Sequence, residues 1–120
     1  MKETVSVIVP AYNEEPRISP TLTRIHSYFK EKGGGFEIIV VDDGSTDSTA
    51  EVVNDLSERL GRIRLIRLSH NTGKGAAIKK GVGSSEGELV LTCDADLSTP
   101  IEEIEKLSSL LRRGCDIAIG

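Results

Sequence analysis

The chain has 120 residues, and its 15 Lys and Arg against 19 Asp and Glu give a formal net charge of −4. This length allows one domain, and 38% hydrophobic with 28% charged residues excludes an intrinsically disordered chain. An acidic chain with 3% aromatic residues lacks the basic surface and stacking rings of a nucleic-acid binder, so no nucleic-acid partner is expected.

Short β-branched runs alternate with amphipathic stretches along the whole chain, which is typical of a parallel sheet with helices on both faces. The predicted strands are Val5–Val9, Phe36–Val41, Ile63–Leu68, Leu89–Cys93 and Ile117–Ile119. Four crossovers would connect them. The predicted fold class is therefore α/β, an open, doubly wound, mostly parallel sheet in which no apolar run reaches the roughly 20 residues of a membrane span.

The helices predicted between these strands have recognisable faces and ends. The first has an apolar face made by Ile18, Leu22, Ile25 and Phe29. It is expected to stop at the glycines 33–35, and the second, which ends at Gly61, has Ser48 and Glu51 at the spacing of a capping box. Residues 99–102 combine an N-cap threonine, a proline and a capping glutamate, so they predict the start of another helix.

Carboxylates follow three of the predicted strands at the point where each strand ends. They are Glu14 after the first strand, Asp42 and Asp43 after the second, and Asp94 and Asp96 after the fourth. Ligands of open α/β sheets bind at this edge. Crowding like charges costs free energy unless a cation or hydrogen-bond donors compensate, so the pattern predicts a functional edge.

The sequence Asp94-Ala95-Asp96 places two hard oxygen ligands on one turn, where a divalent ion would also have room for phosphate oxygens. We expect this ion to be Mg²⁺ or Mn²⁺, held by Asp94 and Asp96. Asp96 is expected to bind it directly, and Asp94 to contact a ribose or a metal-bound water. The alternative is that Asp96 merely supports the following helix.

The pair Asp42 and Asp43 is delivered to the same edge by a buried strand, and Gly44 then lets the backbone turn. A carboxylate there can accept hydrogen bonds from a base or a ribose. The alternative is structural: Asp43 would make a local turn bond, and residues 45–49 would cap the following helix, which is the interpretation we favour for 45–49.

The segment Asn71-Thr72-Gly73-Lys74-Gly75 follows the third strand and opens a helix, where backbone donors and Lys74 could meet an anion. It matches neither the Walker phosphate loop nor the dinucleotide fingerprint. Lys74 is therefore either a phosphate contact or a solvated surface lysine. His26 and His70 are expected to be structural or exposed.

The chain has two cysteines, Cys93 and Cys115, which are widely separated and have no neighbouring histidine. This spacing does not predict a zinc site. We expect no secretory leader before the first strand. We expect reduced thiols and a cytoplasmic protein.

Taken together, and in this order, residues 10–14, 40–47, 71–75 and 94–96 resemble the nucleotide-sugar half of family-two glycosyltransferases with the GT-A fold. Residues 94–100 resemble the dolichyl-phosphate mannose and glucose synthase branch in particular. The resemblance implies a hexosyltransferase that binds a UDP- or GDP-sugar with a metal. The nucleotide-sugar residues it implies, together with Asp42 and Lys74 from the motifs above, are Pro10, Tyr12, Glu14, Val41, Asp42, Asp43, Lys74, Asp94, Ala95 and Asp96.

The same resemblance implies inverting transfer of the sugar to a lipid phosphate or a saccharide acceptor, with the intact enzyme at a cytosolic membrane surface. Residues 1–120 would be the donor-binding portion, with the acceptor half and the catalytic residues beyond residue 120. Little turnover is then expected from this portion alone, and an exposed apolar edge would favour a homodimer. The alternatives are a phosphoryl-transfer domain, receiver-like or an aspartate phosphohydrolase, and a non-catalytic interaction module.

Overall fold

In the computed structural model of the protein, which describes residues 4–96 and 115–119, a five-stranded sheet has the order β3-β2-β1-β4-β5. The strands are β1 (Val5–Ala11), β2 (Phe36–Asp42), β3 (Ile63–Arg67), β4 (Leu89–Cys93) and β5 (Cys115–Ile119). The first four run parallel. The predicted α/β class and mostly parallel sheet are therefore confirmed.

The last strand departs from the predicted topology. β5 pairs antiparallel with β4, so the connection between them is not a fourth parallel crossover. The helix predicted to begin at residues 99–102 lies outside the described residues.

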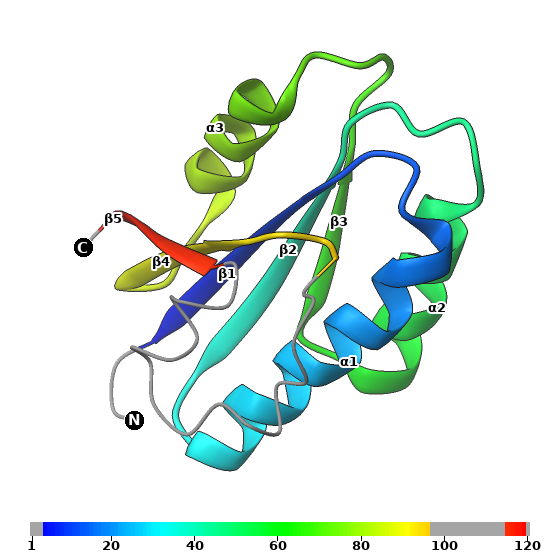
Figure 1. The fold of residues 1–120 in the computed structure, drawn as a ribbon. Helices are drawn as coiled ribbons and strands as arrows, with labels where there is room; N and C mark the ends of the chain where they lie inside the picture. Colours follow the sequence, from blue (N-terminus) through cyan, green and yellow to red (C-terminus); the bar gives the residue numbers. More distant parts are fainter. Residues whose placement is uncertain (1–3, 97–114, 120) are drawn as a thin grey trace.

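Within the part of the chain that the structure describes, three helices cover the two faces of the sheet (Figure 1). They are α1 (Glu15–Lys32), α2 (Thr49–Leu60) and α3 (Lys74–Ser84). α1 and α2 pack on one face and α3 on the other, as the doubly wound prediction requires. The predicted apolar face of α1 is fully buried.

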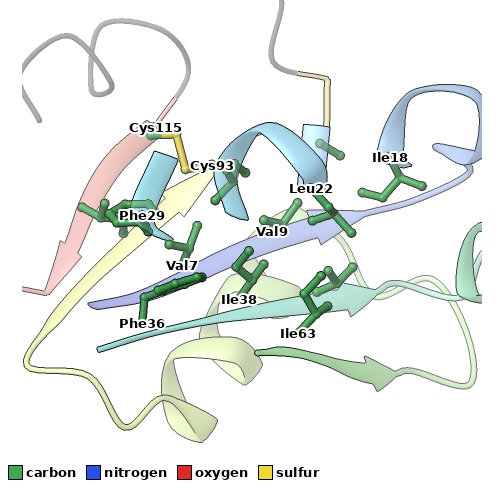
Figure 2. Packing of buried hydrophobic residues seen from close by; sticks show 14 of the residues in the cluster. Val7, Val9, Ile18, Leu22, Phe29, Phe36, Ile38, Ile63, Cys93 and Cys115 are labelled. Atoms are coloured by element: carbon green, nitrogen blue, oxygen red, sulfur yellow. A yellow bond between two sulfur atoms is a disulfide. The ribbon is translucent and has the colours of Figure 1, made fainter. Parts of the chain in front are cut away.

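The strand residues alternate between two cores, because successive side chains of a strand point to opposite faces. Val7 and Val9 belong to the larger cluster under α1 and α2, whereas Ile8 between them packs under α3. Figure 2 shows the larger cluster, in which Phe29 of α1 lies over the sheet.

The start of α2 is stabilised differently from the capping box expected at Ser48. The Ser48 side chain makes no capping hydrogen bond. Instead, the carboxylate of Asp47 accepts hydrogen bonds from the backbone N–H of Thr49, at 3.0 Å, and from its hydroxyl. Asp47 therefore caps this helix, in line with the structural interpretation of residues 45–49.

Cys93 and Cys115 form a disulfide, so the expectation of reduced thiols is wrong for this structure (Figure 2). The antiparallel register places the two residues directly opposite each other at the ends of β4 and β5. The sequence did not indicate this pairing, because the strand predicted at Ile117 began two residues too late. The disulfide fastens the end of β4 immediately before Asp94.

Two glycines of α3 give a prediction about the fold. A Cβ at Gly81 would lie 2.5 Å from Cγ2 of Ile8, so α3 can approach the sheet only because this position has no side chain. We expect Gly81→Ala to lower the free energy of unfolding by about 1–3 kcal/mol through overpacking. A Cβ at Gly83 would meet nothing within 4 Å, so the matched control Gly83→Ala should raise it by up to about 1 kcal/mol. Urea unfolding of both variants measures the contrast, and equal effects would show that α3 does not pack closely at Gly81.

Candidate functional site

A hollow of about 460 Å³ opens at the carboxyl ends of the parallel strands, and we call it the site hollow. Its walls come from the ends of β1, β2 and β4, from the loop after β1 and from the start of α3. Its lining residues are Pro10, Ala11, Tyr12, Glu14, Asp43, Asn71, Gly73, Lys74, Ala77, Asp94, Ala95 and Asp96.

Most of the residues singled out from the sequence meet in this site hollow. They are Pro10, Tyr12, Glu14, Asp43, Lys74, Asp94, Ala95 and Asp96. They come from four separate segments of the chain, which parallel pairing of β1 with both β2 and β4 brings to one edge.

The structure places the side chains of Val41 and Asp42 elsewhere. Val41 is fully buried in the cluster between the sheet and α3. Asp42 is also fully buried, and its Oδ1 accepts a hydrogen bond from the backbone N–H of Ser45 at 3.0 Å. Its Oδ2 accepts no hydrogen bond from the described residues, but lies 3.7 Å from Nε of Arg67. The local turn bond that the structural alternative gave to Asp43 is made by Asp42.

Four lining residues were absent from the candidates chosen from the sequence: Ala11, Asn71, Gly73 and Ala77. Asn71 and Gly73 belong to the segment that also contains Lys74. Ala77 lies one helical turn beyond Gly73, and its backbone N–H donates to the Gly73 carbonyl at 3.0 Å. The position of this whole segment after a strand could have identified these residues, but only Lys74 was chosen from it.

The loop that carries Tyr12 and Glu14 is fastened to the loop after β2. Asn13 has a left-handed backbone, with φ 52°, and its Oδ1 accepts a hydrogen bond from the backbone N–H of Thr46 at 2.8 Å. The backbone N–H of Glu14 donates to Oγ1 of Thr49 at 3.0 Å. Tyr12 itself is 46% exposed, so its ring is available to a ligand.

Asp43 connects the end of β2 to the start of α3. Its Oδ1 accepts hydrogen bonds from the backbone N–H of Thr72 at 2.8 Å and from the Thr72 hydroxyl at 2.7 Å. Its Oδ2 accepts one from the backbone N–H of Gly73 at 2.8 Å. Burial alone would raise the pKa of Asp43, but these hydrogen bonds outweigh it, so the pKa lies below its usual value.

The two loops joined by Asp43 also touch at Gly44. This glycine has φ +78°, and a Cβ there would lie 2.6 Å from the carbonyl carbon of His70. A side chain at this position would therefore have to push the loop before α3 away from β2. Close contact between the loops keeps Asn71 and Lys74 at the edge of the site hollow.

Among residues 4–96 and 115–119, two cations are paired with carboxylates of the site hollow. Nζ of Lys74 lies 3.0 Å from Oδ1 of Asp94. Nη2 of Arg17 lies 2.5 Å from Oε1 of Glu14. The hydrogen bond to Glu14 and the charge of Glu14 raise the pKa of Arg17, and the charge of Asp96 makes a smaller contribution in the same direction. Positive charge from α1 and α3 thus offsets part of the repulsion among the carboxylates.

Asp94 and Asp96 have the donor chemistry of a Mg²⁺ or Mn²⁺ site. Within residues 4–96 and 115–119, no group of three or more His, Cys, Asp or Glu residues is arranged to hold a metal ion. Two carboxylates are nevertheless enough for an ion that keeps several waters or takes phosphate oxygens from a ligand. The ammonium of Lys74 already pairs with Asp94, which shows that a positive charge is stable beside this carboxylate. The two aspartates therefore fit a divalent ion.

None of the described helices combines the length and the apolar character that crossing a bilayer requires.

Comparison with known proteins places these features in a family. Residues 6–120 match the family model described as Glycosyl transferase family 2. The chain is 42% identical, over 116 residues, to undecaprenyl-phosphate 4-deoxy-4-formamido-L-arabinose transferase of Pseudomonas aeruginosa, covering 96% of this chain and 34% of that protein. It is 43% identical, over 110 residues, to dolichyl-phosphate beta-glucosyltransferase ALG5C of Trichomonas vaginalis, covering 88% of this chain and 33% of the relative. The chain thus spans about a third of the length of these relatives.

A solved structure agrees with the sequence relatives. Mannosyltransferase PcManGT from Pyrobaculum calidifontis, in complex with GDP-Man and Mn²⁺, superposes with a TM-score of 0.70 at 34% sequence identity. The match covers 80% of this chain and 28% of that chain.

Asp43 gives a prediction with a defined pH dependence. Asp43→Asn places an amide N–H against a backbone donor, so we expect it to lower the free energy of unfolding at pH 7 by about 1–3 kcal/mol. Because the folded-state pKa of Asp43 is depressed, its contribution is present above the unfolded pKa and is lost as the pH falls through the folded value. The deficit of the variant should therefore shrink below about pH 4.

Denaturant unfolding at pH 7 and pH 3 measures this deficit. Asp55→Asn is the matched control, because Asp55 is 65% exposed and pairs only with Arg59 on the surface of α2 among the described residues. A deficit that is the same at both pH values would contradict the assigned role of the Asp43 carboxylate.

Proposed function

Because the chain belongs to glycosyl transferase family 2, we propose that its site hollow binds a nucleotide diphosphate sugar, a UDP- or GDP-hexose, together with a divalent metal ion. The family and the GT-A fold predicted from the four motifs are confirmed. The relatives described above are named as sugar transferases.

One observation carries the proposal: carboxylates, a lysine and an exposed tyrosine from separate segments line a single hollow. A nucleotide sugar offers matching chemistry. Its base and sugar rings present flat or apolar faces, its hydroxyls donate hydrogen bonds to carboxylates, and its diphosphate needs cations. The mannosyltransferase that superposes on this fold was solved with GDP-Man and Mn²⁺, which supports this ligand class.

We assign the metal to Asp94 and Asp96. A bound Mg²⁺ or Mn²⁺ would neutralise the charge that develops on the departing nucleoside diphosphate. The chain's own residues do the remaining work: Lys74 supplies a positive charge at the same wall, and Ala95 keeps the turn between the two aspartates compact, with its side chain buried.

We assign the base and the ribose to the part of the site hollow that the segment 10–14 and Asp43 line. Pro10 lies near the end of β1, and Tyr12 and Glu14 follow it in a loop that is fixed through Asn13. Asp43 follows β2, and its carboxylate accepts hydrogen bonds from Thr72 and Gly73. We therefore propose that Asp43 shapes the base pocket by holding the start of α3 in place. Val41 and Asp42 pair with Pro10 and Ala11 in the register of β1 and β2, so we assign them to positioning the end of β1.

We propose a polyprenyl phosphate as the acceptor of the intact protein. The two relatives described above are named as undecaprenyl-phosphate and dolichyl-phosphate transferases. Such an acceptor is already an anion at neutral pH, so it has little need of a general base. Its phosphate oxygen would attack the sugar from the face opposite the diphosphate, with inversion, at a cytosolic membrane surface.

Calorimetric titration with UDP and with GDP, each with and without Mn²⁺, tests the donor-site proposal. We expect one nucleoside diphosphate to bind, and Mn²⁺ to tighten its binding by about 5- to 150-fold, the usual range of coupling between two ligands. Metal binding without any nucleotide binding would contradict the donor-site proposal. Binding of neither would contradict the metal assignment as well.

Asp96→Ala tests the metal assignment. We expect this variant to lose most of the effect of Mn²⁺ on nucleotide affinity, because it removes the direct ligand. Its melting temperature should stay equal or rise slightly, because the change removes one of several like charges. Asp55→Ala on the surface of α2 is the control. A lower melting temperature with unchanged metal dependence would mean that Asp96 only supports the chain that follows it.

A further inference from the structure

We propose that Lys74 is a built-in cation of the metal site: its ammonium holds Asp94 until a divalent ion displaces it, and it then binds the donor diphosphate. The inference rests on the proposed function of the site hollow. It adds an exchange of partners, in which one lysine competes with the metal before the nucleotide is bound and cooperates with it afterwards.

The competition follows from the position of the ion pair. Nζ of Lys74 donates a hydrogen bond of 3.0 Å to Oδ1 of Asp94, and both residues line the site hollow with Asp96. An oxygen that coordinates a metal, directly or through its water, loses much of its attraction for an ammonium, because the ion neutralises it. Lys74 and the metal therefore cannot both use Asp94 at full strength.

The backbone of Lys74 is fixed beside Asp94, so its ammonium has only a short way to move from one anion to another. α3 begins at Lys74, and the preceding residue, Gly73, is fixed by the hydrogen bond that its N–H donates to Asp43 at 2.8 Å. The backbone of Lys74 thus has a defined place at the wall, whereas its side chain is 67% exposed and free to turn. A lysine on a four-carbon stem can swing its ammonium to a new anion without moving this backbone.

Other lysines of α3 do not share this position. Lys79 and Lys80 line a separate hollow with Ala76, Gly83 and Ser84. Among the residues that the structure describes, Lys74 is the lysine that lines the site hollow. Lys79 is therefore a matched control, with the same charge on the same helix but without Asp94 as its partner.

The size of the effect follows from the exposure of the pair. Asp94 is 48% exposed and Lys74 is 67% exposed, so solvent screens their attraction. Pairs of this kind change an equilibrium by about two- to five-fold. The lysine is thus a weak competitor that a metal can displace, whereas its charge-assisted hydrogen bond to a diphosphate is stronger and contributes about ten-fold in affinity.

Titration of Mn²⁺ alone into the wild type, Lys74→Met and Lys79→Met, by calorimetry or by the electron paramagnetic resonance signal of free Mn²⁺, tests the competition. We expect Lys74→Met to bind Mn²⁺ alone about two- to five-fold more tightly than the wild type. The same variant should bind the preferred nucleoside diphosphate with Mn²⁺ about ten-fold more weakly. Lys79→Met should change neither affinity, and Lys74→Arg should restore both toward wild-type values.

The opposite signs of the two effects make the inference falsifiable. If Lys74→Met and Lys79→Met change Mn²⁺ binding equally, the effect is general charge and the exchange is refuted. If Lys74→Met weakens both Mn²⁺ and nucleotide binding, Lys74 supports the site without competing with the metal, which also refutes it. If the wild type shows no metal-dependent nucleotide binding, the proposed function itself fails, and this inference fails with it.

Discussion

Parallel pairing of β1 with both β2 and β4 is the constraint on which the rest of the structure depends. All three strands end at the same edge, so residues after β1, β2 and β4 become neighbours although they are far apart in the chain. The side chains of β1 are buried on both faces, which fixes the register. A slip of one residue would turn Val7 and Ile8 to the wrong cores and displace Glu14 relative to Asp94.

Gathering carboxylates at this edge has an electrostatic cost, and the chain offsets it in two different ways. Asp43 is satisfied internally, by backbone and hydroxyl donors of the loop before α3. Glu14 and Asp94 are instead paired with exposed cations, Arg17 and Lys74. Buried hydrogen bonds are costly to break, whereas exposed ion pairs exchange at little cost. At this edge Asp43 is therefore held rigidly, whereas a ligand can replace the cations that pair with Glu14 and Asp94.

The sequence was sufficient to predict the layers and most of the site hollow, because both follow from local patterns. Alternating apolar runs gave the parallel strands, and polar residues directly after strands gave Glu14, Asp43 and Asp94. Features that depend on contacts between distant segments were not predictable. The disulfide depends on the antiparallel register of β5, and the contact of Asp42 with Arg67 depends on the pairing of β2 with β3.

The adjacent residues Asp42 and Asp43 also show that a local sequence pattern does not predict contacts between distant segments. In the pair Asp42 and Asp43, the sequence gives two identical side chains, but a strand directs consecutive residues to opposite faces. One carboxylate therefore faces β3 and the turn at Ser45, and the other faces the start of α3 and the site hollow. Which of the two reaches the ligand edge depends on the register of β2 against β1, and a propensity argument carries no information about it.

The opposite end of the sheet explains why the site can have exchangeable charges without loss of the fold. There Glu37 of β2 accepts hydrogen bonds from Ser6 at 2.6 Å, from the backbone N–H of Glu86 at 2.8 Å and from Arg64 at 2.8 Å. Burial alone would raise the pKa of Glu37, but these donors outweigh it, so the carboxylate stays ionised. The network joins β1, β2, β3 and the turn before β4. With the strands fastened at their amino ends, Lys74 and Asp94 at the carboxyl ends are free to serve a ligand.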